Sequence, residues 1–155
     1  MKVRDIMERR VITVSPKDSI VKVLRLFSQK KISGVPVVEG GKLIGIITDG
    51  DIIANLDIYT PKIHFSSSPD FLLILAGLKS RRGMDEIEKE MQVMKKFKVQ
   101  DFMTKDVITA KPEDSIVKVA RIMHKNGIKR VPILSKKGKL VGIVARQDII
   151  RAFSK

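Results

Sequence analysis

VRDIMERRVITVSPKDSIVKVLRLF, residues 3–27, returns in altered form as VQDFMTKDVITAKPEDSIVKVARIM at residues 99–123. The match continues from ISGVPVV (32–38) to IKRVPIL (128–134), and from GKLIGIITDGDII (41–53) to GKLVGIVARQDII (138–150), with one residue added before Gly138. About half of the aligned positions are identical. The chain is therefore a duplication, and two copies are too few for a solenoid. They predict two half-domains that bury a shared face against each other.

Apolar runs predict three strands in the first copy. These runs cover residues 11–14, 35–38 and 43–47. The Gly40-Gly41 pair between the second and third runs is typical of a hairpin turn, and Gly138 takes that place in the second copy. Each copy is thus expected to contain one separate strand and one hairpin.

Two helices are predicted in each copy. Ser15 has the character of an N-cap, Pro16 suits the first helical position, and Asp18 falls in the first turn. Gly127 is expected to end the corresponding helix of the second copy. A short helix from Asp49 to about Leu56 closes the first copy. The full order is strand, helix, strand, strand, helix.

Composition bounds the class of protein. A formal charge of +14 favours phosphate-bearing partners such as nucleotides, nucleic acid or anionic lipid, although a solvated basic surface gives the same count. The absence of Cys excludes thiolate zinc sites, and His64 and His124 have no ligand-like spacing, so no metal site is predicted. The longest apolar run, FLLILAGL at 71–78, is far shorter than the roughly 20 residues of a membrane span. We expect a cytoplasmic protein with no membrane contact.

Residues 57–96 form an insert between the copies. Pro and Ser make residues 59–70 a predicted loop, and the run at 71–78 is compatible with a helix. An apolar stripe at helical spacing follows, made of Met84, Ile87, Met91 and Met94. This stripe either packs on its own domain or forms a subunit contact, and both alternatives are open.

Thr48 and Asp51 stand where the last predicted strand of the first copy runs into its closing helix. Thr-x-x-Asp at a helix start resembles a capping box, in which both side chains satisfy backbone donors. The alternative is that Asp51 accepts hydrogen bonds from the neighbouring hydroxyls of a ribose, while the Thr hydroxyl and helix amides hold a phosphate. The second copy keeps the carboxylate as Asp148 but has Ala145 in place of Thr, which weakens the capping interpretation without removing it.

The ordered motifs resemble those of a pair of cystathionine β-synthase (CBS) domains, a Bateman module. They are D-x-M near each start, an apolar residue before the Val-Pro step of the hairpin, and Gly-apolar-apolar-x-x-x-Asp at its end. The resemblance covers about residues 1–56 and 97–155. It implies an α/β (α+β) fold in which two β-α-β-β-α repeats, related by a pseudo-twofold axis, pack through their sheets. The implied domains are 1–56 and 97–155, separated by the helical insert 57–96.

The resemblance also implies a ligand and its site. Such modules bind AMP, ADP, ATP or S-adenosylmethionine in two clefts between the halves, as regulatory ligands and not as cofactors. Thr48 and Asp51 match the family's phosphate and ribose residues, and Asp148 matches the second ribose residue. Ala145 departs from the usual Ser or Thr, which leaves phosphate contact there to Arg146. The remaining ligand-binding candidates are Arg9, Val11, Ile12, Ser33, Gly34, Val35, Gly50, Lys105, Val107, Ile108, Lys129, Arg130 and Val131.

Three functions compete. The first is a stand-alone adenosyl-ligand sensor that acts through an effector protein or its own homodimer. The alternative is a basic regulatory protein that binds nucleic acid, whose binding would fall steeply with salt. An enzyme is not expected, because the sequence has no Walker A loop, no G-x-S-x-G, no H-E-x-x-H and no Cys nucleophile.

Overall fold

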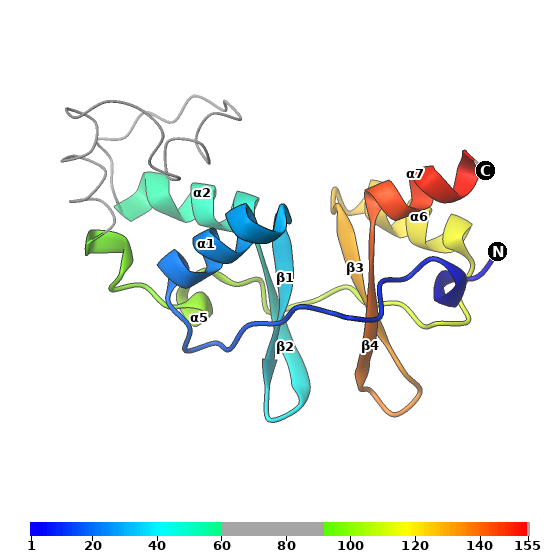
Figure 1. The fold of residues 1–155 in the computed structure, drawn as a ribbon, viewed down its shortest axis with the longest axis horizontal. Coiled ribbons are helices and arrows are strands. Elements are labelled where there is room, and N and C mark those ends of the chain that lie inside the picture. Colours follow the sequence, from blue (N-terminus) through cyan, green and yellow to red (C-terminus); the bar gives the residue numbers. More distant parts are fainter. Residues whose placement is uncertain (60–91, 155) are drawn as a thin grey trace.

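Two similar halves lie side by side in the computed structural model, which describes residues 1–59 and 92–154 (Figure 1). The first half contains α1 (Ile20–Lys30), β1 (Gly34–Glu39), β2 (Lys42–Thr48) and α2 (Asp49–Tyr59). The second half contains α6 (Ile116–Lys125), β3 (Arg130–Leu134), β4 (Leu140–Ala145) and α7 (Arg146–Phe153). Two short helical turns are η1 (Val3–Asp5) and α5 (Val99–Phe102). The expected mixed fold of two repeats is confirmed.

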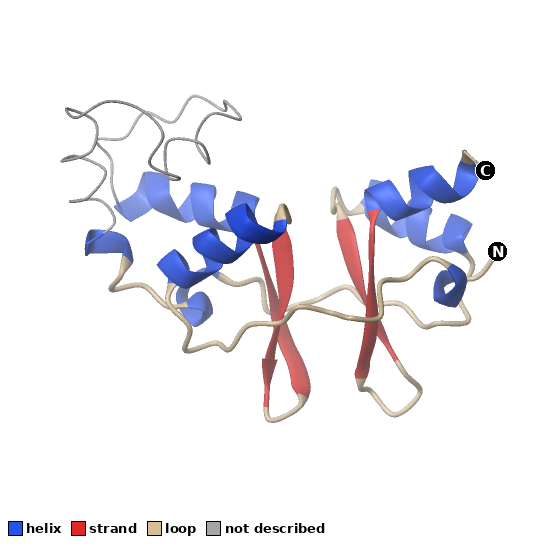
Figure 2. Cartoon of the chain, in the orientation of Figure 1, coloured by secondary structure: helices blue, strands red, loops and turns tan. Residues whose placement is uncertain are grey.

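Each half is built on one antiparallel hairpin. β1 pairs with β2 from Gly34–Thr48 to Glu39–Lys42, and β3 pairs with β4 in the equivalent register. The hairpins lie between the two helical layers, so that the helices of each half cover the face turned away from the other half (Figure 2). Positive φ angles of 56° at Gly40 and 76° at Gly41 explain why glycines occupy the first turn. The predicted hairpins and closing helices are confirmed.

The predicted strand at residues 11–14 is wrong, because only Val14 pairs with β1. The Val14 N–H donates to the Pro36 carbonyl at 3.1 Å, and the Val14 carbonyl accepts the Val38 N–H at 2.9 Å. The adjacent rungs of a parallel ladder would need N–H groups from Pro16 and Pro36, which prolines lack. The second half has the same single bridge at Ala110, where Pro112 and Pro132 stop the ladder in the same way. Two prolines in each copy therefore limit this ladder to one residue.

The predicted helix start at Ser15 is also wrong. α1 begins four residues later, with Ser19 as its N-cap and the Ser19 hydroxyl accepting the Lys22 N–H at 3.2 Å. Residues 15–18 form a turn instead, in which the Asp18 carboxylate accepts the Ser15 N–H at 2.9 Å and pairs with the Lys22 ammonium at 2.7 Å, and Ser19 is extended and pairs with Lys98. Ser115 and Asp114 repeat this arrangement before α6.

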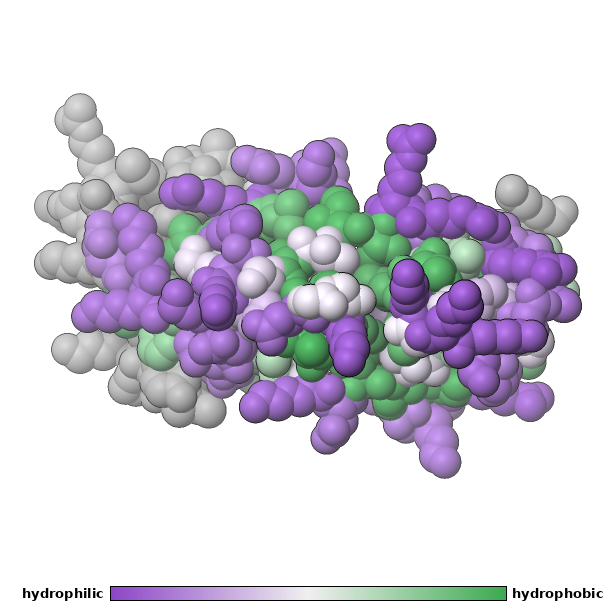
Figure 3. All heavy atoms as spheres, turned by 90° about the horizontal axis from the view of Figure 1, so that it is seen from below, coloured by the Kyte–Doolittle hydropathy of each residue, from purple (hydrophilic) through white to green (hydrophobic). Residues whose placement is uncertain are grey.

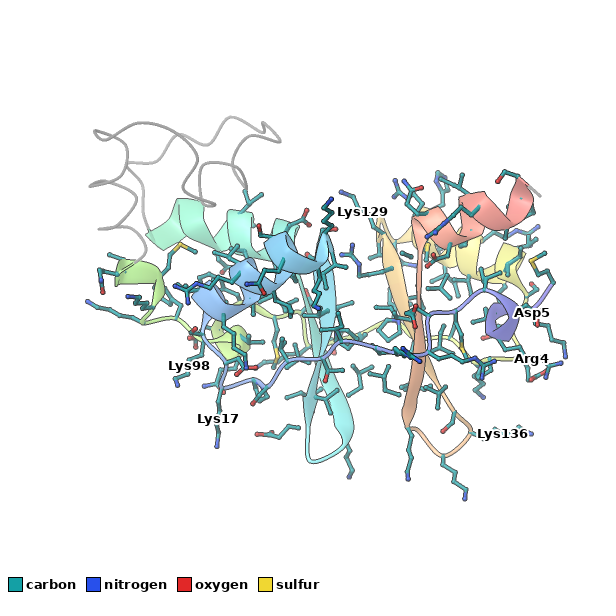
Figure 4. The ribbon with its side chains drawn as sticks, viewed as in Figure 1. Arg4, Asp5, Lys17, Lys98, Lys129 and Lys136 are labelled. Carbon is teal, nitrogen blue, oxygen red and sulfur yellow. The ribbon has the colours of Figure 1, made fainter. Side chains whose placement is uncertain are left out.

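The start of each copy packs on the half formed by the other copy. The Val3 N–H donates to the Asp114 carbonyl at 2.9 Å, and the Val99 N–H donates to the Asp18 carbonyl at the same distance. Figure 4 shows the result at the two ends of the molecule: Arg4 and Asp5 lie beside the second half, whereas Lys98 lies near Lys17 in the first. The two leading segments therefore cross between the halves.

The methionine of each D-x-M motif fills a space left by a glycine in the crossed arrangement. A Cβ atom added to Gly142 would lie 2.6 Å from the Met7 sulfur, and one added to Gly45 would lie 2.7 Å from the Met103 sulfur. Only glycine leaves room for these contacts. The glycine of each hairpin and the methionine of the opposite copy thus form one packing unit.

Each half has its own hydrophobic core. The first core includes Phe27, Ile47, Val99 and Met94, and the second includes Val3, Val119 and Ile133. Met94 is 3% exposed and belongs to the first core, so this end of the predicted stripe packs on its own domain. The rest of the stripe and the helix predicted at 71–78 lie outside the described residues, namely Met84, Ile87, Met91 and residues 71–78. Seen from below, hydrophobic side chains form a band across the middle of the molecule (Figure 3).

Candidate functional site

A cavity of about 380 Å³ lies between the two copies. The first copy contributes the end of β2 and the start of α2, and the second contributes the segment 104–108 and the approach to β3. This volume falls in the range of small-molecule sites. The cavity is lined by Ile46, Thr48, Asp49, Gly50, Asp51, Thr104, Asp106, Val107, Ile108, Gly127, Ile128, Lys129 and Arg130.

Reciprocal hydrogen bonds hold the start of α2 at one wall of the cavity. The Oδ2 atom of Asp51 accepts the Thr48 N–H at 2.9 Å and the Thr48 hydroxyl at 3.0 Å, and the Asp51 N–H donates to the Thr48 hydroxyl oxygen at 3.2 Å. These bonds form the capping box that the motif suggests. The other carboxylate oxygen, Oδ1, accepts the Thr104 hydroxyl at 3.1 Å. The cap therefore occupies one oxygen of Asp51, and the second oxygen faces Thr104 from the other copy.

Lys129 and Arg130 bring positive charge to the cavity. Lys129 is exposed and lies at the end of the hairpins where the two halves meet (Figure 4). Arg130 is half-buried; its Nη1 donates to the Ser33 carbonyl at 2.8 Å and its Nη2 donates to the Ser33 hydroxyl at 2.6 Å. Burial lowers the pKa of the Arg130 guanidinium, and the nearby Asp49 carboxylate acts in the opposite direction. The guanidinium remains charged, since arginine titrates far above neutral pH.

The positions related to this cavity by the repeat carry different charges. Asp49 corresponds to Arg146, Lys129 to Ser33 and Arg130 to Gly34 in the repeat alignment. Asp148 keeps the capping role, because its Oδ2 accepts the Ala145 N–H at 2.8 Å, and its Oδ1 pairs with Arg151 at 2.8 Å instead of a hydroxyl. The two ends of the pseudo-twofold arrangement are therefore chemically unequal.

The cavity gathers seven of the candidate residues. These are Thr48, Gly50, Asp51, Val107, Ile108, Lys129 and Arg130. Ser33 touches this group through Arg130. The other candidates lie outside the cavity lining, namely Arg9, Val11, Ile12, Gly34, Lys105, Arg146 and Asp148, and Ile12 borders a separate hollow along α1.

Val35 and Val131, two of the ligand-binding candidates, do not line the cavity. Their side chains are 1% and 0% exposed and belong to the two hydrophobic cores. Successive residues of a strand point to opposite faces, so Val35 and Val131 face the helices while their neighbours Gly34 and Arg130 face the other half. Ile46 and Ile128 line the cavity in their place.

Sequence reasoning missed several cavity residues. Asp49 is the first variable position of the Thr-x-x-Asp motif formed by Thr48 and Asp51, so the motif gives it no role. Thr104 and Asp106 flank the candidate Lys105. Thr104 reaches the cavity because the leading segments cross, which pairs Thr104 with Ile46 of β2. The sequence of one copy alone does not indicate this pairing.

The described residues contain neither a metal-binding cluster nor a membrane-spanning helix. In residues 1–59 and 92–154, no group of three or more His, Cys, Asp or Glu side chains is arranged to hold a metal ion. Within the same ranges, none of the helices has both the length and the apolar character required to cross a bilayer.

Comparison with known proteins bears on the family. The CBS domain model matches residues 3–58 and 99–155. The protein MJ1426 of Methanocaldococcus jannaschii is 37% identical over 98% of this chain and 90% of its own length. An inosine-5′-monophosphate dehydrogenase of Korarchaeum cryptofilum is 32% identical over 91% of this chain, which spans only 22% of that enzyme.

Solved structures give the same assignment. The CBS domain pair of protein MJ0100, in complex with 5′-methylthioadenosine and S-adenosyl-L-methionine, matches with a TM-score of 0.71 and 26% identity, covering 99% of this chain and 96% of that one. CBSX2, in complex with AMP, shares the fold with a TM-score of 0.67 at 24% identity, covering 99% of this chain and 96% of that one. With two family matches that together span most of its length, this chain belongs to the CBS domain family and carries two copies of the domain.

Proposed function

We propose that this CBS domain pair is a regulatory module that binds an adenosyl ligand in the cavity between its two copies. The candidate ligands are AMP, ADP, ATP and S-adenosylmethionine. The observation that carries the proposal is the cavity itself, which sets the carboxylate of Asp51 in one copy with Lys129 and Arg130 of the other. A ligand that contacts both sets of residues bridges the two copies. Such a ligand can favour one relative placement of the copies over another, which is how a regulatory module responds to binding.

Asp51 is the proposed ribose residue. Its capping bonds fix the carboxylate in place, and the Thr104 hydroxyl is the only bond found for Oδ1 among the described residues. A carboxylate oxygen can accept more than one hydrogen bond, so Oδ1 is able to accept a ribose hydroxyl as well. Capping and ribose binding are therefore compatible roles of one side chain.

Lys129 and Arg130 are the proposed phosphate residues. Both line the cavity and both are cations, and a guanidinium can form paired bonds with phosphate oxygens. Val107, Ile108 and Ile128 supply apolar surface for a base in the same cavity. The MJ0100 domain pair, at 26% identity, is solved with two adenosyl compounds, which supports the ligand class.

The remaining parts of the assignment are also proposals. Arg146 and Asp148, together with Arg9, Val11, Ile12, Ser33 and Gly34, are assigned to the second cleft, and Lys105 to the first. The domains are assigned to 1–56 and 97–155 with the insert 57–96 between them. We propose that the protein acts as a homodimer or through an effector protein; the exposed Ile53 on α2 and its equivalent Ile150 on α7, 38% and 53% exposed, support pairing through these helices.

Thermal unfolding tests the function. AMP, ADP, ATP and S-adenosylmethionine are each added to the purified protein, and a ligand present at 100 times its dissociation constant should stabilise the fold by about 2.7 kcal/mol. Titration calorimetry of any ligand that shifts the transition then gives its affinity. If no compound shifts the transition and none produces heat, the sensor function is refuted. The nucleic-acid alternative predicts instead a binding constant that falls steeply with salt.

A further inference from the structure

Arg130 belongs to one cleft but rests on a residue of the other. It lines the cavity that contains Asp51, yet both guanidinium bonds go to Ser33, which leads into β1 of the opposite copy. The contact is close: a Cβ atom added to Gly34 would lie 2.1 Å from Nη1 and 2.8 Å from Cζ of Arg130. The guanidinium thus covers Ser33 and Gly34, two of the positions assigned to the second cleft.

This arrangement occurs once and not twice. The position equivalent to Arg130 in the first copy is Gly34, so the pseudo-twofold axis relates a long cation to a residue with no side chain. Gly34 is buried beneath Arg130, and its lack of a side chain is what allows the guanidinium to lie there. The pair is matched in shape, and only one of the two clefts can be covered in this way.

The present hydrogen-bond partners of the guanidinium are neutral. Among the described residues, no carboxylate lies within 4.0 Å of Arg130, and both acceptors are uncharged oxygens of Ser33. Hydrogen bonds between a guanidinium and phosphate oxygens are charge-assisted and stronger than bonds to neutral acceptors. A phosphate that enters the cavity beside Lys129 therefore competes favourably with Ser33 for Arg130.

We propose that Arg130 couples the two clefts and makes the number of bound molecules depend on whether the ligand carries phosphate. A ligand with phosphates in the first cleft draws the guanidinium away from Ser33, and the second cleft is then free to bind. An uncharged nucleoside leaves Arg130 on Ser33, and the second cleft stays covered. The coupling follows because the phosphate binds the guanidinium only when it has left Ser33. This inference rests on the proposed function, which supplies the ligand class.

Titration calorimetry with ATP and adenosine tests the coupling, since the two ligands share base and ribose and differ only in the phosphates. The native chain should bind two ATP molecules and one adenosine. Arg130→Met, which keeps an unbranched apolar stem but removes the guanidinium with its donors and its charge, should bind two adenosines. Gly34→Ala should do the same, because the new methyl group displaces the guanidinium while Arg130 is still present. Circular dichroism and thermal melting establish that each variant is folded.

Lys129→Met is the matched control. Lys129 lines the same cavity. In the described part of the chain, its ammonium group makes no hydrogen bond to Ser33. This variant should weaken ATP binding but still bind a single adenosine. Two adenosines on the native chain, or one adenosine on both Arg130→Met and Gly34→Ala, would overturn the coupling while leaving the proposed function intact. If the native chain binds neither ATP nor adenosine, the coupling is refuted, whereas the proposed function is refuted only if AMP, ADP and S-adenosylmethionine also fail in the thermal unfolding assay.

Discussion

Asp51→Asn separates ribose binding from helix capping more sharply than any other single change. In the native chain, Oδ2 of Asp51 accepts two bonds from Thr48, and Oδ1 accepts the Thr104 hydroxyl. Asparagine keeps one oxygen, which is enough to cap α2, and its amide nitrogen can donate to the Thr104 hydroxyl oxygen. Because both contacts have a replacement, the free energy of unfolding should fall by no more than about 1 kcal/mol.

The ligand affinity should change far more than the stability. The amide nitrogen of the introduced asparagine cannot accept a hydrogen bond from a ribose hydroxyl, and the lost bond to a charged group is worth roughly 1.5–3 kcal/mol. This loss corresponds to a rise in the dissociation constant of roughly ten- to a hundred-fold. Calorimetry with the tightest adenosyl ligand measures the affinity, and a thermal melt without ligand measures the stability.

A 2′-deoxy ligand and the equivalent variant Asp148→Asn provide the controls. The native chain should bind the 2′-deoxy ligand more weakly than the ribose form, and Asp51→Asn should bind the two about equally. Asp148→Asn should leave the first cleft unaffected, since Asp148 lies outside its lining. If Asp51→Asn binds the ribose ligand as tightly as the native chain does, the carboxylate is a helix cap and nothing more.

The remaining predictions concern backbone strain, packing, pH dependence and assembly. Lys31 has a left-handed φ of 52° where the second copy has Gly127, so Lys31→Gly should stabilise the fold by about 0.5–1 kcal/mol in a denaturant melt, and an unchanged or lower stability would contradict this. Gly142→Ala should destabilise by about 1–3 kcal/mol because the methyl group would overlap Met7, and the double variant with Met7→Ala should recover part of the loss. Hydrogen bonding to Lys118 and to the Lys111 N–H lowers the pKa of Asp114 in the folded state. The stabilisation that the Asp114 carboxylate gives is therefore present above its unfolded pKa and is lost as the pH falls through its folded pKa. Asp114→Asn should reduce the loss of stability between about pH 5 and pH 2, and an unaltered acid profile would count against this role. Ile150→Glu should shift sedimentation toward the monomer if α7 forms the dimer contact, whereas an unchanged sedimentation coefficient would exclude that helix.

The repeat made the fold predictable, and local chemistry limited the detail. Apolar runs and the Gly40-Gly41 turn located the hairpins correctly, because a hairpin is decided by residues close together in the chain. The strand expected at 11–14 failed because its length depends on Pro36, a residue of a different strand that cannot donate a hydrogen bond. The helix start failed because Ser15 and Ser19 are both good caps by type, and Ser19, the actual cap, pairs with Lys98 of the other copy, a contact that local sequence does not indicate.

Part of the cavity lining could be predicted from residue type. Thr48, Asp51, Lys129 and Arg130 carry hydroxyl, carboxylate and cationic groups at motif positions, and the structure brings all four to one cavity. The contact between Arg130 and Ser33 joins residues 97 positions apart, and no periodicity in the sequence indicates it. Contacts across the pseudo-twofold axis depend on the relative placement of the two copies. The sequence of one copy alone does not determine that placement.

The crossing of the leading segments has a consequence for how this chain can be divided. Val3 completes the core of the second half and Val99 that of the first, so one copy alone lacks a residue that its own core requires. An isolated copy could restore that contact only by domain swapping with a second molecule, each lending its first residues to the other. The present chain is in this sense a swapped dimer whose subunits are joined by a peptide link, and the pairing of its two halves does not depend on protein concentration. Cutting the gene between the copies should therefore give fragments that fold together when mixed, and each fragment on its own should fold only as a swapped dimer.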